Sequence, residues 1–320
     1  MPVFIPKTTS DLCGEAIASK MPCKAPLSAW KSRDYLEHFS AATGKTRLVF
    51  RKDLGIPGTE LEIPCGQCIG CRLDKARAWA VRIMHEVSMH EVSSFLTLTY
   101  ADDPISLNKR DITLFLKKLR RHLDYTENIK IRYFQVGEYG EQFARPHHHV
   151  ILFGYDFPDK KPFKKIGEHM QYVSPLLAGL WPHGLHSIGT VTEDSAMYCA
   201  GYCHKKITGD KAKEHYQDRL PEYASMSRRP GLGKPWLDKY MADIFTHDKV
   251  VVHDGYICRP PKYYDRLHAE LHPDRHAQIS AQRRLRAKEN PENTDERRLT
   301  THKILWKKHD ELTRKYEQQT

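Results

Sequence analysis

The stretch RPHHHVILFG at residues 145–154 joins three consecutive histidines to four apolar residues and a glycine. A short apolar run that contains valine, isoleucine and phenylalanine predicts a buried β-strand. Alternate side chains of a strand share a face, so His147 and His149 point to one side and His148 to the other. Two imidazoles on one face of a rigid strand can bind the same metal ion. The alternative is a polar strand end with solvated histidines.

A carboxylate from the preceding segment would complete such a site. Residues 129–140, IKIRYFQVGEYG, have the pattern of a strand, and a short polar loop separates them from the histidines, so the two segments predict a hairpin. Glu138 lies nine residues before His147 and is the expected third ligand, with Glu141, further into the loop, as the alternative. Two imidazoles and a carboxylate with open coordination positions suit Mg²⁺ or Mn²⁺ in phosphoryl chemistry.

Helical and strand patterns alternate around this hairpin. Apolar residues recur at helical spacing within 72–92 and 109–123, strand-forming residues fill 94–100 and 186–191, and polar capping residues open a helix at 192–206. We also expect a short strand at 47–53, a weakly helical stretch at 165–181 and a hairpin at 249–260. This order predicts an α+β fold in which helices pack on an antiparallel β-sheet.

The helix expected at 192–206, TEDSAMYCAGYCHKK, carries two tyrosines on one face. Tyr198 and Tyr202 lie four residues apart, and Lys205 and Lys206 follow one turn later on the same side. A phenol has a pKa of about 10 and needs a nearby cation or a metal-polarised phosphate to act as a nucleophile. A lysine one turn away can stabilise phenolate or phosphate charge. An aromatic stripe that packs against the sheet is the alternative.

Three cysteines, Cys65, Cys68 and Cys71, fall within the seven residues CGQCIGC. Thiolates at this spacing readily share Zn²⁺, and a closed tetrahedral site needs a fourth ligand, for which we expect Cys23 in MPCKAP. A zinc or iron–sulfur knot would link the N-terminal segment to the following domain. The alternative is that the cysteines are free thiols. The zinc deaminase signature is excluded because residues 1–64 contain no HxE upstream of PCGQC.

The chain is basic, with a formal net charge of +11 over 320 residues, which suits a polyanionic partner such as nucleic acid. Six side chains are candidate phosphate contacts: Lys117, Lys118, Arg120, Arg121, Lys205 and Lys206. The first four lie in the helix expected at 109–123, where a solvated face is an equally good interpretation. The last two follow the tyrosines. No stretch approaches the roughly 20 apolar residues of a transmembrane helix, so we expect no membrane partner.

Taken together and in order, these motifs resemble the HUH endonucleases, and within them the replication-initiator proteins of gokushoviruses, small single-stranded DNA phages of the Microviridae. The resemblance covers most of residues 21–265. Its motifs are MPCKAPLSAW (21–30), PCGQCIGCRLDKARAWAVRI (64–83), FLTLTY (95–100), LNKRDITLFLKKLR (107–120), VGEYG (136–140), RPHHHVILFG (145–154), YCAGYCHKK (198–206) and PGLGKPWLDKY (230–240). One departure is His148, where such motifs usually carry a bulky hydrophobic residue.

The resemblance implies a metal-dependent, site-specific endonuclease and strand-transferase that cuts an origin in single-stranded DNA and starts rolling-circle replication. His147, His149 and Glu138 would bind the metal, and Tyr198 and Tyr202 would form the 5′-phosphotyrosine link. The implied setting is the host bacterial cytoplasm, with host helicase and polymerase as partners. The alternatives are a plasmid-type initiator or transposase with the same site, and a non-catalytic zinc-knot protein that binds nucleic acid.

Four regions are expected along the chain. Residues 1–20 look like a leader that is disordered, and 21–71 form an N-terminal segment with the cysteine cluster. Residues 72–265 would be the HUH nicking and strand-transfer domain. Residues 266–320 are dense in charge and predict either a solvated helix or a disordered tail.

Overall fold

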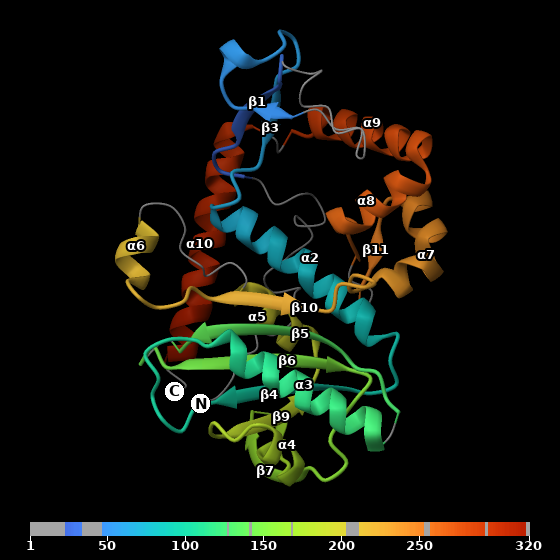
Figure 1. Ribbon diagram of the computed structural model, residues 1–320. Helices are drawn as coiled ribbons and strands as arrows, with labels where there is room; N and C mark the ends of the chain where they lie inside the picture. The colour runs from blue at the N-terminus through green and yellow to red at the C-terminus, as the bar shows by residue number, and fades with distance from the viewer. Residues whose placement is uncertain are drawn as a thin grey trace. The chain divides into compact units, whose positions relative to one another are not determined.

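The computed structural model in Figure 1 describes residues 23–33, 47–126, 128–140, 143–167, 169–202, 211–252, 257–291 and 294–317, without the side chains of Tyr202, Lys211 and 308–317. The expected leader at 1–20 lies outside the described residues, as do Glu141, Lys205 and Lys206. The described chain forms two compact units, one from Lys75 to Arg284 and one that combines Lys20–Asp74 with Leu285–Arg314.

An antiparallel sheet of seven strands forms the centre of the first unit, in the order β10-β5-β6-β4-β9-β8-β7. Its strands are β4 Ser93–Thr99, β5 Arg132–Tyr139, β6 Pro146–Phe153, β7 Lys161–Ile166, β8 His169–Val173, β9 His186–Thr190 and β10 Tyr223–Met226. The hairpin expected from the histidine stretch is present, because β5 and β6 pair antiparallel. The α+β fold class is therefore confirmed.

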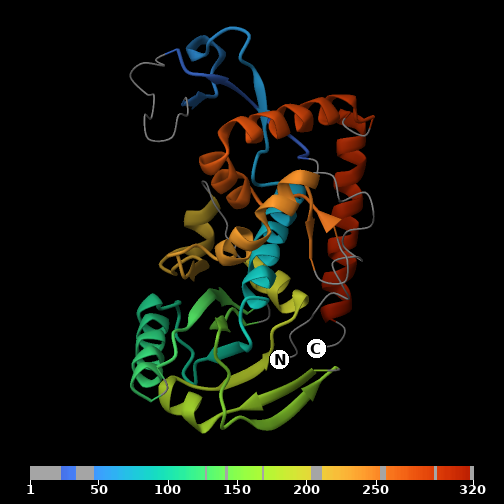
Figure 2. The same cartoon turned by 90° about the vertical axis from the view of Figure 1, so that its right-hand side faces the viewer.

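Helices cover both faces of this sheet, as Figures 1 and 2 show. On one face, α3 (Lys109–Thr126) and α4 (Pro175–Leu180) pack against the even-numbered residues of β6, such as Val150 and Leu152. On the other face, α2 (Ile69–Val87) and α5 (Glu193–Tyr202) pack against odd-numbered residues, such as Ile151 and Phe153. The strand alternation thus separates two cores, and His147 and His149 belong to the α2–α5 face.

A third core lies within the same unit and joins α2 to α7 (Lys234–His247), α8 (Lys262–Leu271) and the start of α9 (Pro273–Glu289). The expected hairpin at 249–260 is found as β11 (Val250–Val251) paired antiparallel with β12 (Ile257–Cys258). Ile279 of α9 is buried in this core, and Arg283 forms ion pairs with Asp248 and Asp265. Most of the described residues of the charged C-terminal part lie in α9 and in a further helix, Asp295–Glu317.

The second unit contains a small antiparallel sheet in the order β2-β1-β3, made of β1 Leu27–Lys31, β2 Leu48–Val49 and β3 Leu61–Ile63. The short 3₁₀ helix η2 (Lys52–Leu54) and the long helix α10 (Asp295–Glu317) complete it. Arg298 of α10 forms an ion pair with Glu62 at 3.0 Å. The strand expected at 47–53 is present only as the two residues of β2.

Two expected elements differ from the structure. The helix expected at 72–92 begins at Ile69 and ends at Val87, because tight turns follow in which Met89 N donates to Glu86 O and His90 N to Val87 O.

The stretch at 165–181 is mostly not helical. Its first part belongs to the β7–β8 hairpin, and only Pro175–Leu180 is helix, capped by Ser174 Oγ, which accepts from Leu177 N at 3.0 Å. Pairing between strands outweighed the weak local helical pattern.

A buried imidazole in the third core makes stability depend on pH. His85 of α2 stacks on Trp236 with ring centroids 3.4 Å apart, and burial lowers its pKa from 6.5 to about 4. Between these values the unfolded chain binds more protons than the folded chain, so the free energy of unfolding should fall by about 2 kcal/mol from pH 7 to pH 5 through this residue. In urea titrations at both pH values, His85→Phe should remove that part of the pH dependence. An unchanged pH dependence would contradict this assignment.

Candidate metal centre and tyrosine site

The hairpin register places three potential metal ligands on one face of the sheet. Glu138 of β5 lies directly opposite His147 of β6, and Val136 lies opposite His149. Glu138 Oε1 is 2.6 Å from His147 Nε2 and 2.9 Å from His149 Nε2. Glu138 and His149 are buried, whereas His147 is partly exposed. One ligand atom from each residue lies within 4.8 Å of the others, so the three residues expected from the sequence are brought together.

Hydrogen bonds on the far side of each imidazole aim its Nε2 at the centre of this group. His147 Nδ1 lies 3.1 Å from the carbonyl oxygen of Arg145, which can only accept, so Nδ1 carries the proton of the neutral ring. His149 Nδ1 lies 3.1 Å from Thr97 Oγ1 of β4. The Nε2 lone pair of neutral His147 thus faces a carboxylate oxygen, and two acceptors at this distance need a proton or a cation between them.

The carboxylate of Glu138 is suited to a cation. Burial by itself would raise its pKa, but His147 and His149, when protonated at Nε2, donate hydrogen bonds that outweigh burial and lower the pKa to about 2. Its second oxygen, Oε2, is buried and has no hydrogen-bond partner among the described residues. Such an unsatisfied buried acceptor is costly unless a ligand occupies it. Two nitrogen donors and a carboxylate therefore fit a divalent ion at this position.

His148 occupies the opposite face and is not part of this group. Its side chain is fully buried, and its Nε2 lies 3.2 Å from the hydroxyl of Tyr100, which donates to Asp111 Oδ2 at 3.0 Å. The ring also lies edge-on to Trp181. Similar motifs usually carry a hydrophobic residue at position 148. An imidazole fits there in this chain because a hydroxyl partner and aromatic rings surround it. The roles of Thr97, Tyr100 and Asp111 were not predicted from the sequence, although alternation in FLTLTY places Thr97 on one face of a strand and so could have indicated it.

The helix α5 brings a tyrosine to the triad of Glu138, His147 and His149. Thr192 and Ser195 cap its N-terminus with reciprocal hydrogen bonds of 2.8 and 3.2 Å. The small buried residues Ala196 and Ala200 allow the helix to approach the sheet closely. The hydroxyl of Tyr198 donates to Glu138 Oε1 at 3.4 Å, and its ring lies edge-on to His149 with centroids 5.2 Å apart.

Tyr202 is the last residue of α5, one helical turn after Tyr198. Its backbone is therefore placed on the same helix as expected, while its side chain lies outside the described residues. Lys205 and Lys206, which the sequence places on the same expected helix, lie outside the described residues as well.

An antiparallel sheet that carries two histidines and a glutamate on one face, with helices on both faces, is the HUH-endonuclease-like fold that the sequence indicates. Comparison with known proteins agrees with this class. A family model described as replication-associated protein ORF2/G2P matches residues 93–207, which include β4, the triad and α5. No solved structure shows a significant match to the chain.

Three curated relatives are similar over most of the chain. The replication-associated protein VP4 of Bdellovibrio phage phiMH2K is 35% identical over 235 residues, which are 71% of this chain and 73% of the relative. The replication-associated protein ORF2 of Spiroplasma virus 4 is 34% identical over 64% of this chain and 67% of the relative. The replication-associated protein ORF4 of Chlamydia phage 1 is 30% identical over 65% of this chain and 54% of the relative. The chain therefore belongs to the replication-associated protein family of gokushovirus-type Microviridae phages.

The structure adds one observation on membranes. None of the helices in the described ranges combines the length and the apolar character that a bilayer span requires.

Proposed function

We propose that this phage replication protein initiates rolling-circle replication by nicking one strand at the phage origin through a tyrosine, and that it later rejoins the displaced strand. The contact between Tyr198 and Glu138 carries this proposal. A helix-borne phenol oxygen lies 3.4 Å from the carboxylate oxygen that two imidazoles share, so a candidate nucleophile and a candidate metal site meet at one point.

His147, His149 and Glu138 would hold a divalent ion, for which we propose Mg²⁺ or Mn²⁺. When bound, such an ion would draw negative charge from a non-bridging oxygen of the scissile phosphate. The protein contributes the orientation of the ligands, because Thr97 and the Arg145 carbonyl hold the two rings, and the sheet register holds Glu138.

Tyr198 would be the nucleophile that attacks the phosphorus. Its phenolic oxygen would form a bond to phosphorus while the bond from phosphorus to the 3′ oxygen breaks. The phenol releases its proton to solvent and the departing 3′ oxygen takes one up, so the step leaves a 5′-phosphotyrosine and a 3′-hydroxyl without net change in protons. One phosphodiester replaces another, and the reaction is therefore reversible and can rejoin strands.

A second tyrosine on the same helix would permit a second cut. Tyr202 follows Tyr198 by one turn of the same helix, and we propose that the two phenols attack in turn at the same metal site. The first cut would free a 3′ end for synthesis, and the second would release the displaced strand for closure. We propose that Lys205 and Lys206, which follow Tyr202 in the sequence, stabilise the phosphate charge in both steps.

Two alternatives are separated from this proposal in different ways. A plasmid-type initiator or transposase would use the same residues, and membership in a phage protein family favours the phage initiator over it. A non-catalytic nucleic-acid-binding protein would bind DNA without any covalent link, and its binding would not change when the tyrosines become phenylalanine.

The deciding experiment uses single-stranded oligonucleotides that tile the phage's own genome. Each is incubated with the purified chain and Mn²⁺ or Mg²⁺ and analysed on a denaturing protein gel. We expect an upward shift of the protein with origin-containing oligonucleotides only, and none in the presence of EDTA. Binding on a native gel without any denaturation-resistant adduct would reject the nickase and favour the binding protein.

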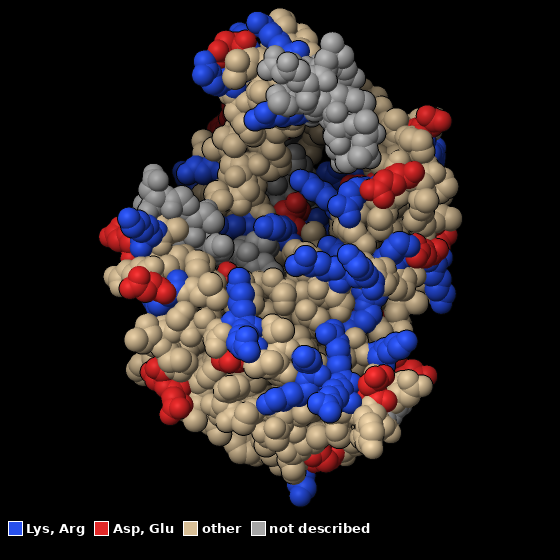
Figure 3. Space-filling model, viewed as in Figure 1, with Lys and Arg blue, Asp and Glu red and all other residues tan. Residues whose placement is uncertain are grey.

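A basic surface extends over α3, on the face of the unit that Figure 3 shows. Its exposed cations are Lys109, Arg110, Lys117, Lys118, Arg120 and Arg121. Because α3 covers the opposite side of the sheet from Glu138, these side chains could not contact the scissile phosphate. We propose instead that this α3 basic face binds the backbone of DNA that passes round the sheet.

Replacing Lys117, Lys118 and Arg121 together by glutamine should therefore weaken binding without slowing the chemical step. Loss of three phosphate contacts lowers the slope of log Kd against log salt concentration by about 2 for single strands. The nicking rate at saturating DNA should remain that of the wild-type protein. Fluorescence anisotropy over a salt series measures the slope.

The matched control removes the same charge elsewhere in the unit, by replacing Lys239, Lys249 and Arg284 with glutamine. All three are exposed and lie on α7, before β11 and on α9. Equal losses of affinity in the two triple variants would show that overall charge, rather than the α3 basic face, carries the effect.

The setting of these reactions follows from the family. A phage initiator works where phage DNA is copied, and we propose the host bacterial cytoplasm, with the host helicase and polymerase extending the freed 3′ end. Each partner can be tested by adding it to the nicking reaction and measuring strand displacement.

A further inference from the structure

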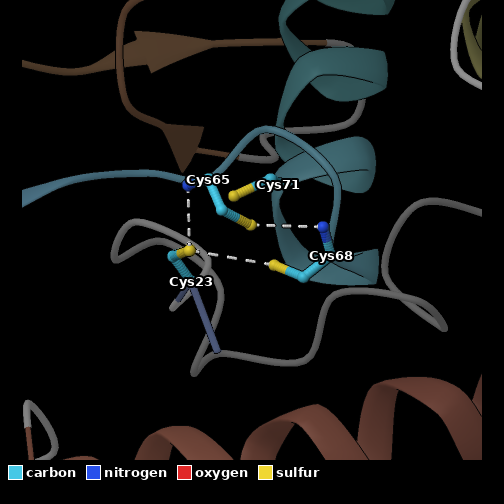
Figure 4. A group of neighbouring side chains, drawn as sticks. All are labelled: Cys23, Cys65, Cys68 and Cys71. Atoms are coloured by element: carbon cyan, nitrogen blue, oxygen red, sulfur yellow. Dashed lines mark hydrogen bonds between the residues drawn. The ribbon is translucent and has the colours of Figure 1, made fainter. Parts of the chain in front are cut away.

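Four cysteine side chains converge within the second unit (Figure 4). The sulfur atoms of Cys23, Cys65, Cys68 and Cys71 all lie within 4.8 Å of one another, and those of Cys23 and Cys68 are 3.9 Å apart. None of them is in a disulfide. Zinc–sulfur bonds of about 2.3 Å in a tetrahedron separate the sulfurs by roughly 3.8 Å, which matches this arrangement.

The fold, rather than local sequence alone, assembles this cluster. Cys23 precedes Cys65 by 42 residues along the chain. Strands β1 and β3 pair antiparallel with Leu27 opposite Ile63, so the residues just before β1 lie beside the residues just after β3. This pairing brings Cys23 to the CGQC turn, where the other three ligands are already close in sequence.

Backbone groups around the cluster are oriented for anionic sulfur. Cys65 N donates to Cys23 Sγ at 3.2 Å, and Cys68 N donates to Cys65 Sγ at 3.4 Å. Gly66 has a φ of 74°, in the left-handed region that favours glycine, and so allows the tight turn. Cys71 lies in the first turn of α2, where the helix dipole favours negative charge.

The sheet beside the cluster has very little core of its own. In β1, β2 and β3, the only buried residue is Ala29. A sheet that buries so little apolar surface is not stable by itself and commonly depends on a metal or a disulfide. Four reduced thiols in contact would supply that stability if a metal ion joined them.

We propose that Cys23, Cys65, Cys68 and Cys71 bind one Zn²⁺ in a closed tetrahedral site that holds the N-terminal three-stranded sheet together. This Cys₄ site is structural, because four protein ligands leave no open position for a substrate. It is separate in ligand chemistry from the histidine–glutamate triad, and it does not depend on the nicking activity. A multi-iron cluster fits less well, because its thiolates are divided among two or more iron atoms and lie further apart than these four sulfurs, which are within 4.8 Å of one another.

Elemental analysis of the full chain, purified without chelator, tests the proposal directly. We expect one zinc per chain and no iron. The Cys68→Ser variant should lose this zinc, while Cys258→Ala, which removes another buried cysteine outside the cluster, should keep it. His149→Ala should also keep it, and this variant shows that the zinc does not occupy the triad. A zinc content near zero, iron in its place, or full retention of zinc by Cys68→Ser would overturn the assignment.

A second measurement avoids the risk that Cys68→Ser fails to fold. Wild-type protein is titrated with a thiol reagent in the presence of a chromogenic zinc chelator. We expect release of one zinc for every four rapidly modified thiols, and exchange into Co²⁺ should give the visible absorption bands of tetrahedral thiolate coordination. Zinc release without thiol modification, or cobalt bands of an octahedral oxygen site, would contradict four cysteine ligands.

Discussion

The double replacement Tyr198→Phe with Tyr202→Phe is expected to abolish the covalent protein–DNA adduct. Loss of an enzyme nucleophile typically lowers turnover by about a thousandfold or more. Phenylalanine keeps the ring, so the edge-on contact between residue 198 and His149 and the packing of α5 should survive. Only the oxygen that we propose to attack phosphorus is removed. Adduct yield on denaturing gels, with DNA binding measured in parallel, gives the result.

The single variants and a distant control make this prediction specific. If both phenols act, each single variant should retain adduct formation on the remaining tyrosine, and mass spectrometry of the nucleotide-linked peptide would identify it. Tyr125→Phe is the matched control, because that side chain is 92% exposed at the end of α3. Its adduct yield should equal that of the wild-type protein. Adduct formation by the double variant would refute the assignment of the nucleophiles.

The second large effect is expected from Glu138→Gln. The amide has the volume of the carboxylate in this buried position but lacks its negative charge, so the fold should persist while the affinity for a divalent ion falls. We expect nicking at fixed Mn²⁺ to slow by about 100-fold or more, and the Mn²⁺ concentration for half-maximal rate to rise. The measurement is the initial nicking rate over a series of Mn²⁺ concentrations.

His148→Leu provides the matched control for the triad. This variant changes the histidine between the two ligands, but on the opposite face of the sheet, and restores the hydrophobic residue usual in such motifs. His148 Nδ1 has no hydrogen-bond partner among the described residues, and Tyr100 would still donate to Asp111. We expect nicking to be retained and stability to change by no more than about 1 kcal/mol. Wild-type metal dependence in Glu138→Gln, or loss of nicking in folded His148→Leu, would contradict the proposed ligands.

Local patterns predicted much of the site because the relevant distances along the chain are short. The β5–β6 hairpin spans few residues, and strand alternation separates His147 and His149 from His148 before any tertiary contact is known. The same locality predicts that Tyr198 and Tyr202 share a helix and that the cysteines of CGQCIGC lie at the start of another, although α2 begins at Ile69 and so includes Cys71. Where the local signal was weak, as at 165–181, the helical prediction was wrong for the residues up to Val173, because pairing between β7 and β8 decided their conformation; only Pro175–Leu180 is helix.

Other features depend on contacts between distant segments. Thr97 became a partner of His149 only through the pairing of β4 with β6, and Tyr198 reaches Glu138 only because small residues let α5 pack on the sheet. The candidate phosphate contacts of α3 proved to lie on the face opposite the triad, which no charge pattern could reveal.

The sequence by itself determined the α+β class, the family, the hairpin that carries the candidate metal ligands and the helix that carries the tyrosines. Periodicity and short loops encode these features, and both act over a few residues. Tertiary structure alone decided which face of the sheet each helix covers, that Cys23 meets the CGQC turn, and that a phenol lies beside the triad. These arrangements arise from the register between strands and the burial of two separate cores, and both are properties of the folded chain as a whole.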